Sequence, residues 1–363
     1  MLSGLRLVEF DGMGPTPFAA RLLADLGADV ARVARAGASD RAAAAEMLAG
    51  RDVVRLDLKS SDGQAAALAL MARADGVIEG FRPGVMERLG LGPDACLRVN
   101  PALAYVRVTG WGQDGPLAQR AGHDLNYIAI TGALNAIGAA DRPPPPPLNL
   151  LGDYGGGSAF AVIGLLAAVL NARATGIGRV IDAAMVDGVA ALSTAIHGLA
   201  NAGRWQDERE ANTLDGGAPF YRCYACSDGK FVAVAALEPQ FFSQLLEGLD
   251  IDPARFDRRD RSQWAEMAGA FTERLASRTR DQWAASFEAS DACVTPVLSF
   301  LEAKRHPHNV ARDTYRMPLP AAAPRFSPAV AGATAGGATD VEAVLARWVR
   351  PRGGTLCKPA PGS

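Results

Sequence analysis

Several features that identify common protein classes are scarce in this chain. Its 37 Lys and Arg residues are nearly balanced by 39 Asp and Glu residues, which gives a formal net charge of -2. Nucleic-acid-binding proteins usually carry a basic surplus, so this balance argues against a nucleic-acid partner. It still allows a local basic pocket for a phosphorylated ligand.

Cysteines are few, odd in number and widely spaced: Cys96, Cys223, Cys226, Cys293 and Cys357. This distribution does not suit a disulfide framework, and the first residues show neither the basic region nor the apolar run of a secretory signal. We therefore expect a protein of the reducing cytoplasm. Cys223 and Cys226 have the spacing of a redox or zinc pair, but no second pair accompanies them and their segment is predicted to be a strand. Structural roles are favoured for both, and no metal is expected.

Long apolar runs are limited to residues 158–174, an Ala-rich segment. It is short for a membrane span and favours a buried helix, so no membrane partner is expected. Apolar residues make up 49% of the 363 residues, which is enough for a sizeable core in two domains or one large one.

The first part of the chain alternates between short apolar segments and helical segments. Strands are predicted at 5–10, 29–33, 53–58, 76–79, 103–109 and 179–182. Helices are predicted at 15–26, 64–74, 85–89, 93–99, 158–174 and 183–200. This alternation predicts an α/β fold with a parallel sheet and helices on both of its faces.

The region from 215 to 300 has a different pattern. Two strands, at 221–226 and 230–235, are separated by a Ser-Asp-Gly turn, and three helices follow at 240–249, 263–277 and 280–289. This pattern predicts a small α+β domain. The expected organisation is a large domain over residues 1–189, a small domain over 215–300, and linkers over 190–214 and 301–314. A helix is predicted at 340–349, and the tail from Arg350 is expected to be disordered.

Two glycine-rich segments carry a histidine and an aspartate: His123 follows Gly122, and Asp153 precedes three glycines at a predicted helix start. Imidazole titrates near neutral pH without perturbation. Two acid/base groups that face one substrate carbon can remove a proton and return it. Two interpretations stay open for each residue. His123 is either a site residue or structural, and Asp153 either caps the helix or stands beside amides that hold an oxyanion.

Arginines recur near the ends of the predicted strands, at positions 32, 35, 51, 55, 82 and 88. They are either solvated charges or a cradle for phosphates, because open α/β sheets bind ligands at the carboxyl ends of their strands. Arg35 and Arg82 are the best placed. The turn at 11–15 has only half of a dinucleotide fingerprint, so NAD is not expected. By its own position, Glu238 is predicted to be an exposed helix cap.

Segments along residues 2–350 resemble the α-methylacyl-CoA racemases, members of the family III CoA-transferase superfamily. They include LLADLGADV at 22–30, VTGWGQDGP at 108–116, AGHDLNY at 121–127 and PPLNLLGDYGGGS at 146–158. The early segments are shared with CoA-transferases, whereas the GHD segment favours a racemase. The resemblance implies a Rossmann-like large domain that a C-terminal segment, 315–350, completes, a small α+β domain, and an interlocked homodimer.

The resemblance also implies an activity and its residues. A racemase of this kind inverts C2 of a 2-methylacyl-CoA thioester by two-base proton transfer through an enolate. His123 and Asp153 would be the bases, and Glu238, from the partner chain, would orient His123. Coenzyme A is part of the substrate, and no other cofactor is implied. The resemblance places Asp124, Asn149, Tyr221 and the amide of Gly155 near the site, and it implies CoA contacts from Arg35, Leu58, Lys59, Arg82 and Arg88.

Two other functions are compatible with these residues. In a family III CoA-transferase, Asp153 would be a nucleophile that forms a mixed anhydride with the acyl group, and His123 would be incidental. A non-catalytic acyl-CoA-binding protein would bind the thioester without exchange of its C2 hydrogen. The acyl surface of racemases is often rich in methionine, whereas residues 190–201 contain none, so the sequence does not specify the acyl chain.

Overall fold

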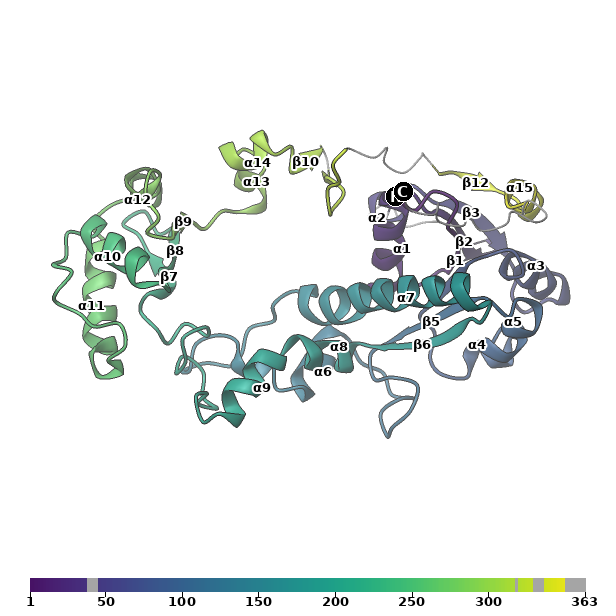
Figure 1. The fold of residues 1–363 in the computed structure, drawn as a ribbon, viewed down its shortest axis with the longest axis horizontal. Helices are drawn as coiled ribbons and strands as arrows, with labels where there is room; N and C mark the ends of the chain where they lie inside the picture. The colour runs from purple at the N-terminus through teal and green to yellow at the C-terminus, as the bar shows by residue number, and fades with distance from the viewer. Residues whose placement is uncertain (38–44, 317–318, 329–335, 350–363) are drawn as a thin grey trace, which may run out of the picture. The chain divides into compact units, whose positions relative to one another are not determined.

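The computed structural model describes residues 1–37, 45–316, 319–328 and 336–349. The chain divides into two compact units, which Figure 1 draws with their elements labelled. The first unit contains Met1–Ile128, Leu148–Leu192 and the described residues from Ala322 onward, and the second contains Ala129–Pro147 and Ser193–Ala321. The tail from Arg350, which we expected to be disordered, lies outside the described residues.

A seven-stranded sheet forms the centre of the first unit. Its strands are β1 (Arg6–Phe10), β2 (Asp29–Arg35), β3 (Asp52–Leu56), β4 (Gly76–Glu79), β5 (Ala104–Thr109), β6 (Arg179–Ala184) and β12 (Ala338–Thr339). They lie in the order β12-β3-β2-β1-β4-β5-β6, and every neighbouring pair is parallel. The predicted Rossmann-like parallel sheet is therefore confirmed. The strand order reverses between β1 and β4, and ligands of such sheets bind beyond the carboxyl ends of the strands at this reversal.

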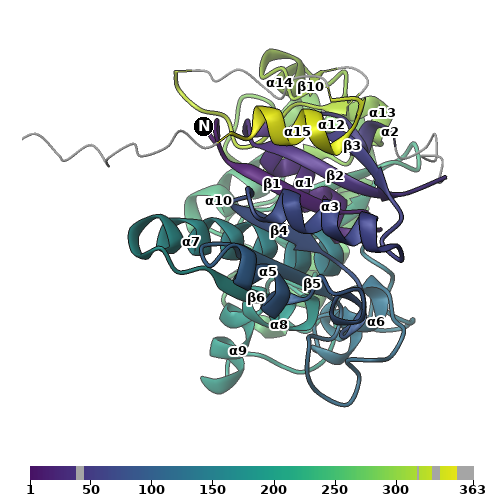
Figure 2. The same cartoon turned by 90° about the vertical axis from the view of Figure 1, so that its right-hand side faces the viewer.

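Helices cover both faces of this sheet, as predicted (Figures 1 and 2). Side chains alternate in direction along a strand, so β1 sends Leu7 to one face and Val8 to the other. Leu7 packs with α1 (Pro15–Asp25) and α7 (Phe160–Thr175). Val8 packs with elements on the opposite face: α3 (Ser61–Met71), α4 (Val85–Arg88), α5 (Pro93–Val99) and α15 (Val341–Arg347).

The helical stretch Leu150–Thr175 is long and apolar enough to cross a membrane by length and composition. It consists of a π-helix, η3 (Leu150–Ala159), that runs directly into α7. The stretch packs against α1, β5 and β6, and Ala161 and Leu165 are fully buried there. These contacts are those of a core helix.

The second unit contains a three-stranded antiparallel sheet with helices on one face. Its strands are β7 (Tyr221–Ala225), β8 (Phe231–Ala235) and β9 (Val294–Pro296), in that order. Tyr224, Val232 and Val294 form one core with α10 (Pro239–Gly248), α11 (Trp264–Leu275) and α12 (Arg280–Phe287). The predicted α+β character is confirmed. The strand β9 was not predicted, because three residues are too few to show alternation.

The two segments expected to be linkers contain helices. Residues 190–214 include the end of α8 (Met185–Leu192) and all of α9 (Thr194–Asn201), and 301–314 include most of α13 (Phe300–Ala303) and all of α14 (Pro307–Ala311). Local signals explain the last two: Ser299 and Glu302 form a reciprocal capping box, and Pro307 is favourable in a first helical turn. The second unit also includes residues 129–147, which we had grouped with the large domain. The remaining short elements are α2 (Ala45–Leu48), η2 (Leu134–Ala136), η4 (Arg261–Gln263), β10 (Tyr315–Arg316) and β11 (Leu319–Pro320).

A buried ion pair links β1 to the segment before β3. The Nη1 of Arg51 donates to both carboxylate oxygens of Glu9, at 3.1 and 2.9 Å, and to the carbonyl of Pro17 at 2.9 Å. Both side chains are almost completely buried. Removal of one partner would leave the other charge buried without compensation, which costs far more than the pair gains when intact.

We predict that Arg51→Ala lowers the free energy of unfolding by about 3–5 kcal/mol in urea titrations, because Glu9 loses its compensating charge. The exposed Arg98→Ala serves as the control and should change it by less than about 0.5 kcal/mol. A Glu9→Leu/Arg51→Met double variant should recover most of the loss. Equal stabilities for Arg51→Ala and Arg98→Ala would contradict the role of this ion pair.

Candidate active site

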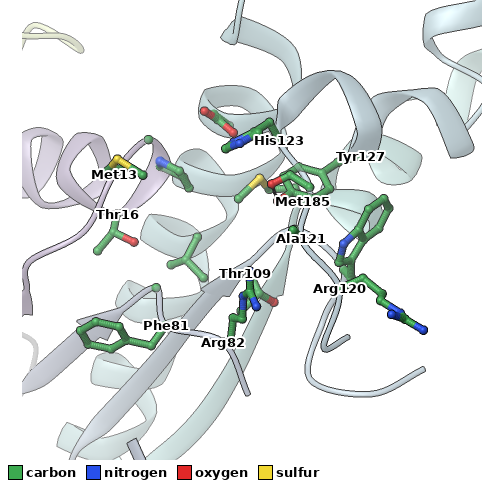
Figure 3. A pocket seen from close by; sticks show the side chains of 18 of the residues that line it. Met13, Thr16, Phe81, Arg82, Thr109, Arg120, Ala121, His123, Tyr127 and Met185 are labelled. Carbon is green, nitrogen blue, oxygen red and sulfur yellow. Dashed lines mark hydrogen bonds between the residues drawn. The ribbon is translucent and has the colours of Figure 1, made fainter. Parts of the chain in front are cut away.

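A cavity of about 590 Å³ opens in the first unit where the strand order reverses. Figure 3 labels residues from the turn before α1 (Met13), from α1 (Thr16) and from the start of α8 (Met185). The other labelled residues come from the ends of strands (Phe81, Arg82, Thr109) and from the segment that carries His123. His123, Asn149 and Asp153 all line this cavity. The structure thus brings the histidine and the aspartate singled out in the sequence to one cavity.

The backbone of His123 is held at the start of α6 (Asp124–Ile130). Its N–H donates to Oδ1 of Asn126 at 3.1 Å, and its carbonyl accepts from the amides of Asn126 and Tyr127 at 2.8 and 3.2 Å. The hydroxyl of Tyr127 donates to the carbonyl of Gly122. These bonds fix the backbone on both sides of His123, whose imidazole is exposed.

Two glycines make room for the ring of Tyr127. A Cβ at Gly110 would overlap this ring, and a Cβ at Gly122 would lie 2.8 Å from it and 2.8 Å from the ring of Trp111. The Tyr127 and Trp111 rings pack edge to face with centroids 4.7 Å apart. Sequence reasoning missed this support for His123, although both glycines were part of the quoted segments.

Asp153 stands on the π-helix η3, which corrects our prediction of a loop that becomes helical at Ser158. The amide of Tyr154 donates to the carbonyl of Asn149, five residues earlier, at 3.3 Å. Such wide turns occur frequently at functional sites. Glycine explains the local geometry, because a Cβ at Gly188 on α8 would overlap the backbone of Gly156 on the π-helix.

The Asp153 carboxyl group is half-buried beside polar and charged neighbours. Nδ2 of Asn149 donates to its Oδ2 at 3.3 Å, and Gly14 approaches so closely that a Cβ there would lie 2.9 Å from this oxygen. Burial and the carboxylate of Asp124 raise the pKa of Asp153, whereas the bond from Asn149 and the nearby His123 oppose the increase. A raised carboxyl pKa suits a group that must both accept and return a proton near neutral pH.

The amide of Asp153 is not available to a ligand. It donates to Oδ1 of Asp124 at 2.6 Å. Gly155 lies inside the π-helix, where amides bond to carbonyls five residues earlier. The Asp153 amide therefore does not hold an enolate oxygen, contrary to our expectation. The role expected for the amide of Gly155 stays a prediction. The residue that accepts this hydrogen bond, Asp124, is itself buried.

A second cavity, of about 470 Å³, lies beside β2 and β3. Its lining includes Arg35, Leu58 and Lys59, which we had predicted to contact CoA, and Phe81 lines both cavities. Arg82 lines the first cavity. Arg88, the remaining predicted contact, is exposed on α4 and is not among the residues that line these two cavities.

Two of the arginines considered for a phosphate cradle have structural roles instead. Arg51 pairs with Glu9, and Arg32 is buried with its Nη1 2.7 Å from Oδ1 of Asp11. Buried and exposed arginines both occur within or beside the predicted strands, so the sequence did not separate them.

Glu238 and Tyr221 belong to the second unit. Glu238 is exposed at the N-cap of α10, where its side chain makes no capping hydrogen bond, and Tyr221 begins β7. The exposed position agrees with the expectation from sequence, and the approach of Glu238 to His123 stays a prediction.

Cys223 is exposed and Cys226 is buried, both as free thiols. Within the described ranges, no group of three or more His, Cys, Asp or Glu side chains could hold a metal ion.

Comparisons with known proteins identify the family of this chain. The model of CoA-transferase family III matches residues 2–338. The α-methylacyl-CoA racemase of Mus musculus is 43% identical over 92% of this chain and 89% of its own length, and that of Homo sapiens is 42% identical over 86% and 82%. A CAIB/BAIF family protein from Brucella suis shares the fold with a TM-score of 0.80 at 24% identity, over 96% of this chain and 99% of its own. The chain belongs to CoA-transferase family III.

We predict that Gly188→Ala lowers the free energy of unfolding by about 1–3 kcal/mol, because the added methyl group must push α8 away from the π-helix. Gly269→Ala in α11 is the matched control, because a Cβ there meets nothing within 4 Å. It should raise the free energy of unfolding by about 0.5–1 kcal/mol through helix propensity. Similar effects of the two substitutions in urea titrations would show that the Gly156–Gly188 contact does not constrain the π-helix.

Proposed function

We propose that the protein is an α-methylacyl-CoA racemase that inverts the C2 stereocentre of 2-methylacyl-CoA thioesters. The observation that carries this proposal is the presence of His123 and Asp153 in the lining of one cavity. Proton transfer to and from carbon needs two acid/base groups that can reach the same substrate atom. The relatives named α-methylacyl-CoA racemase, which match most of this chain, give independent support.

The reaction requires opposite protonation states of the two groups at the start of each turnover. For one epimer, neutral His123 takes the C2 proton while protonated Asp153 donates a proton to the opposite face of the carbon. For the other epimer, ionised Asp153 takes the proton and the imidazolium of His123 donates. In between, the electron pair from the broken C–H bond spreads onto the thioester oxygen as an enolate. Burial raises the pKa of Asp153, which favours the acid form of this carboxyl group relative to an exposed aspartate.

The two cavities suit the two ends of an acyl-CoA. The exposed cations Arg35 and Lys59 beside the second cavity would contact the phosphates, and Leu58 and Phe81 would contact apolar parts of the ligand. Arg82 lines the first cavity, where the thioester would lie. Coenzyme A enters as part of the substrate, so the reaction needs no separate cofactor.

Further features of the proposal come from the family resemblance. The active form would be an interlocked homodimer, in which Glu238 of one chain orients the imidazole of His123 of the other and fixes its tautomer. The near balance of charge and the free cysteines are consistent with a cytoplasmic enzyme that acts on a small acyl-CoA without a nucleic-acid or membrane partner.

The first test is incubation of the protein with a single epimer of a 2-methylacyl-CoA in deuterium oxide, without an acceptor acid. We expect deuterium to enter at C2 and the other epimer to accumulate, because two-base transfer exchanges the C2 hydrogen during inversion. Proton NMR follows both quantities.

A CoA-transferase would behave differently in this experiment. Asp153 is half-buried and lines the cavity, so it could also attack an acyl group. Turnover that requires a second carboxylic acid, with a covalent adduct on Asp153 and no exchange at C2, would replace the racemase proposal. Tight binding of acyl-CoA with neither reaction would indicate a binding protein.

We predict that His123→Ala and Asp153→Ala each reduce inversion by at least about a thousandfold, because inversion in either direction uses both groups. Affinity for CoA, measured by calorimetry, should change by less than about threefold, since neither residue lines the second cavity. Retention of most of the activity in either variant would refute the two-base scheme.

A further inference from the structure

Asp124 connects the two residues that the proposed reaction uses. It follows His123 directly in the chain and is the first residue of α6. Its Oδ1 accepts the backbone N–H of Asp153 at 2.6 Å. Asp124 and Asp153 lie 29 residues apart in the sequence, yet this one side chain joins the segment of His123 to that of Asp153.

The bond satisfies a donor that the π-helix itself cannot satisfy. Amides in the first turn of a helix have no partner within the helix, and Asp153 lies in the first turn of η3. Asn149, at the N-cap, makes no capping bond with its side chain. Asp124 therefore acts as the cap of this helix from a different element.

The approach of Asp124 depends on a glycine. A Cβ at Gly152 would lie 2.6 Å from Oδ1 of Asp124 and 3.1 Å from Cγ2 of Ile128. A bond to a charged acceptor at this distance is short and roughly twice as strong as a neutral one. This contact sets the position of the turn that carries Asp153.

The other carboxylate oxygen of Asp124 has no evident structural purpose. Asp124 is only 7% exposed, and its Oδ2 is buried without a hydrogen-bond partner in the described part of the chain. Leaving such an oxygen unpaired is costly. An asparagine could accept the same N–H with its carbonyl oxygen, so capping alone does not require the charge.

We propose that Asp124 is a positioning residue that sets the relative placement of His123 and Asp153 and, by its negative charge, tunes proton transfer at Asp153. This inference rests on the proposed racemase function. The titratable or charged groups around Asp153 come from two segments: Asp124, His123 and Tyr127 from α6 and the residue before it, and Arg82 from the segment after β4. All of them except the buried Asp124 line the same cavity as Asp153. Gly14, from the turn before α1, adds no charge. Asp124 is the anion among these neighbours, and it is the one that opposes ionisation of Asp153.

The test compares Asp124→Asn, Asp124→Ala and the control Asp75→Asn with the wild type. Asp75 also accepts a hydrogen bond from a backbone amide of another element, that of Arg6 at 2.9 Å. It precedes β4 and so lies at the amino ends of the strands, whereas the cavity lies at their carboxyl ends. Each epimer of a 2-methylacyl-CoA is incubated separately in deuterium oxide over a range of pH. Inversion and exchange with retention at C2 are measured together.

Asp124→Asn keeps an acceptor for the Asp153 amide and loses the charge. We expect the pH midpoint for proton abstraction by Asp153 to fall by about one unit, because a neighbouring negative charge no longer opposes its ionisation. Asp75→Asn should leave this midpoint unchanged.

Asp124→Ala loses the bond as well. We expect the rate of inversion to fall by about a hundredfold, because His123 and Asp153 are no longer held at fixed positions relative to one another. Exchange with retention, which needs one base, should fall much less, so the ratio of exchange to inversion rises. A variant that is only partly folded would lower both rates by the same factor.

The outcomes separate this inference from the function on which it rests. Two results together would overturn the role of Asp124 and leave the racemase proposal intact, provided that the wild type racemises. The first is an unchanged pH midpoint for proton abstraction by Asp153 in Asp124→Asn. The second is an unchanged ratio of exchange to inversion in Asp124→Ala. Absence of C2 exchange in the wild type would overturn both. If Asp124→Ala does not fold, the pH midpoint for proton abstraction by Asp153 in Asp124→Asn alone tests the role of Asp124.

Discussion

The contact between the backbones of Gly156 and Gly188 determines much of the geometry of the first unit. It allows α8 to lie against the π-helix, which in turn continues into the core helix α7. Asp153 is therefore attached to a rigid element that packs on the sheet, although its own segment is rich in glycine. Glycine here does not provide flexibility. It removes the side chains that would separate two backbones.

The site combines two ways of holding an acid/base group. His123 is held by a short-range network, in which Asn126 and Tyr127 fix its backbone from within the next turn of the chain. Asp153 is held over long range, by Asp124 and by the approach of Gly14. Both residues line the cavity where the strand order reverses, so the sheet determines where the cavity lies, and the segments between its strands carry the acid/base groups.

The sequence predicted the sheet of the first unit well, because β1, β2, β4 and β5 are short apolar runs bounded by glycine or polar residues. It also singled out His123 and Asp153, which line one cavity, because an imidazole and a carboxylate beside glycines stand out from a core pattern. It did not predict the π-helix, since no local propensity distinguishes a π-turn from a loop. Nor could it reveal that Arg32 and Arg51 are buried or that Asp124 accepts the Asp153 amide, because each depends on a partner distant in sequence.

The strand β12 joins the edge of the sheet beside β3, although 281 residues separate Leu56 from Ala338. The helix α15 then packs next to α3, with Trp348 buried and Arg347 paired with Asp29 and Asp52. While the chain is being synthesised, β3 is consequently an open edge strand until the whole second unit has left the ribosome. Open edges are where chains pair with the wrong partner. A chain interrupted before β12 would contain every residue that lines the two cavities and would still expose β3 as an open edge.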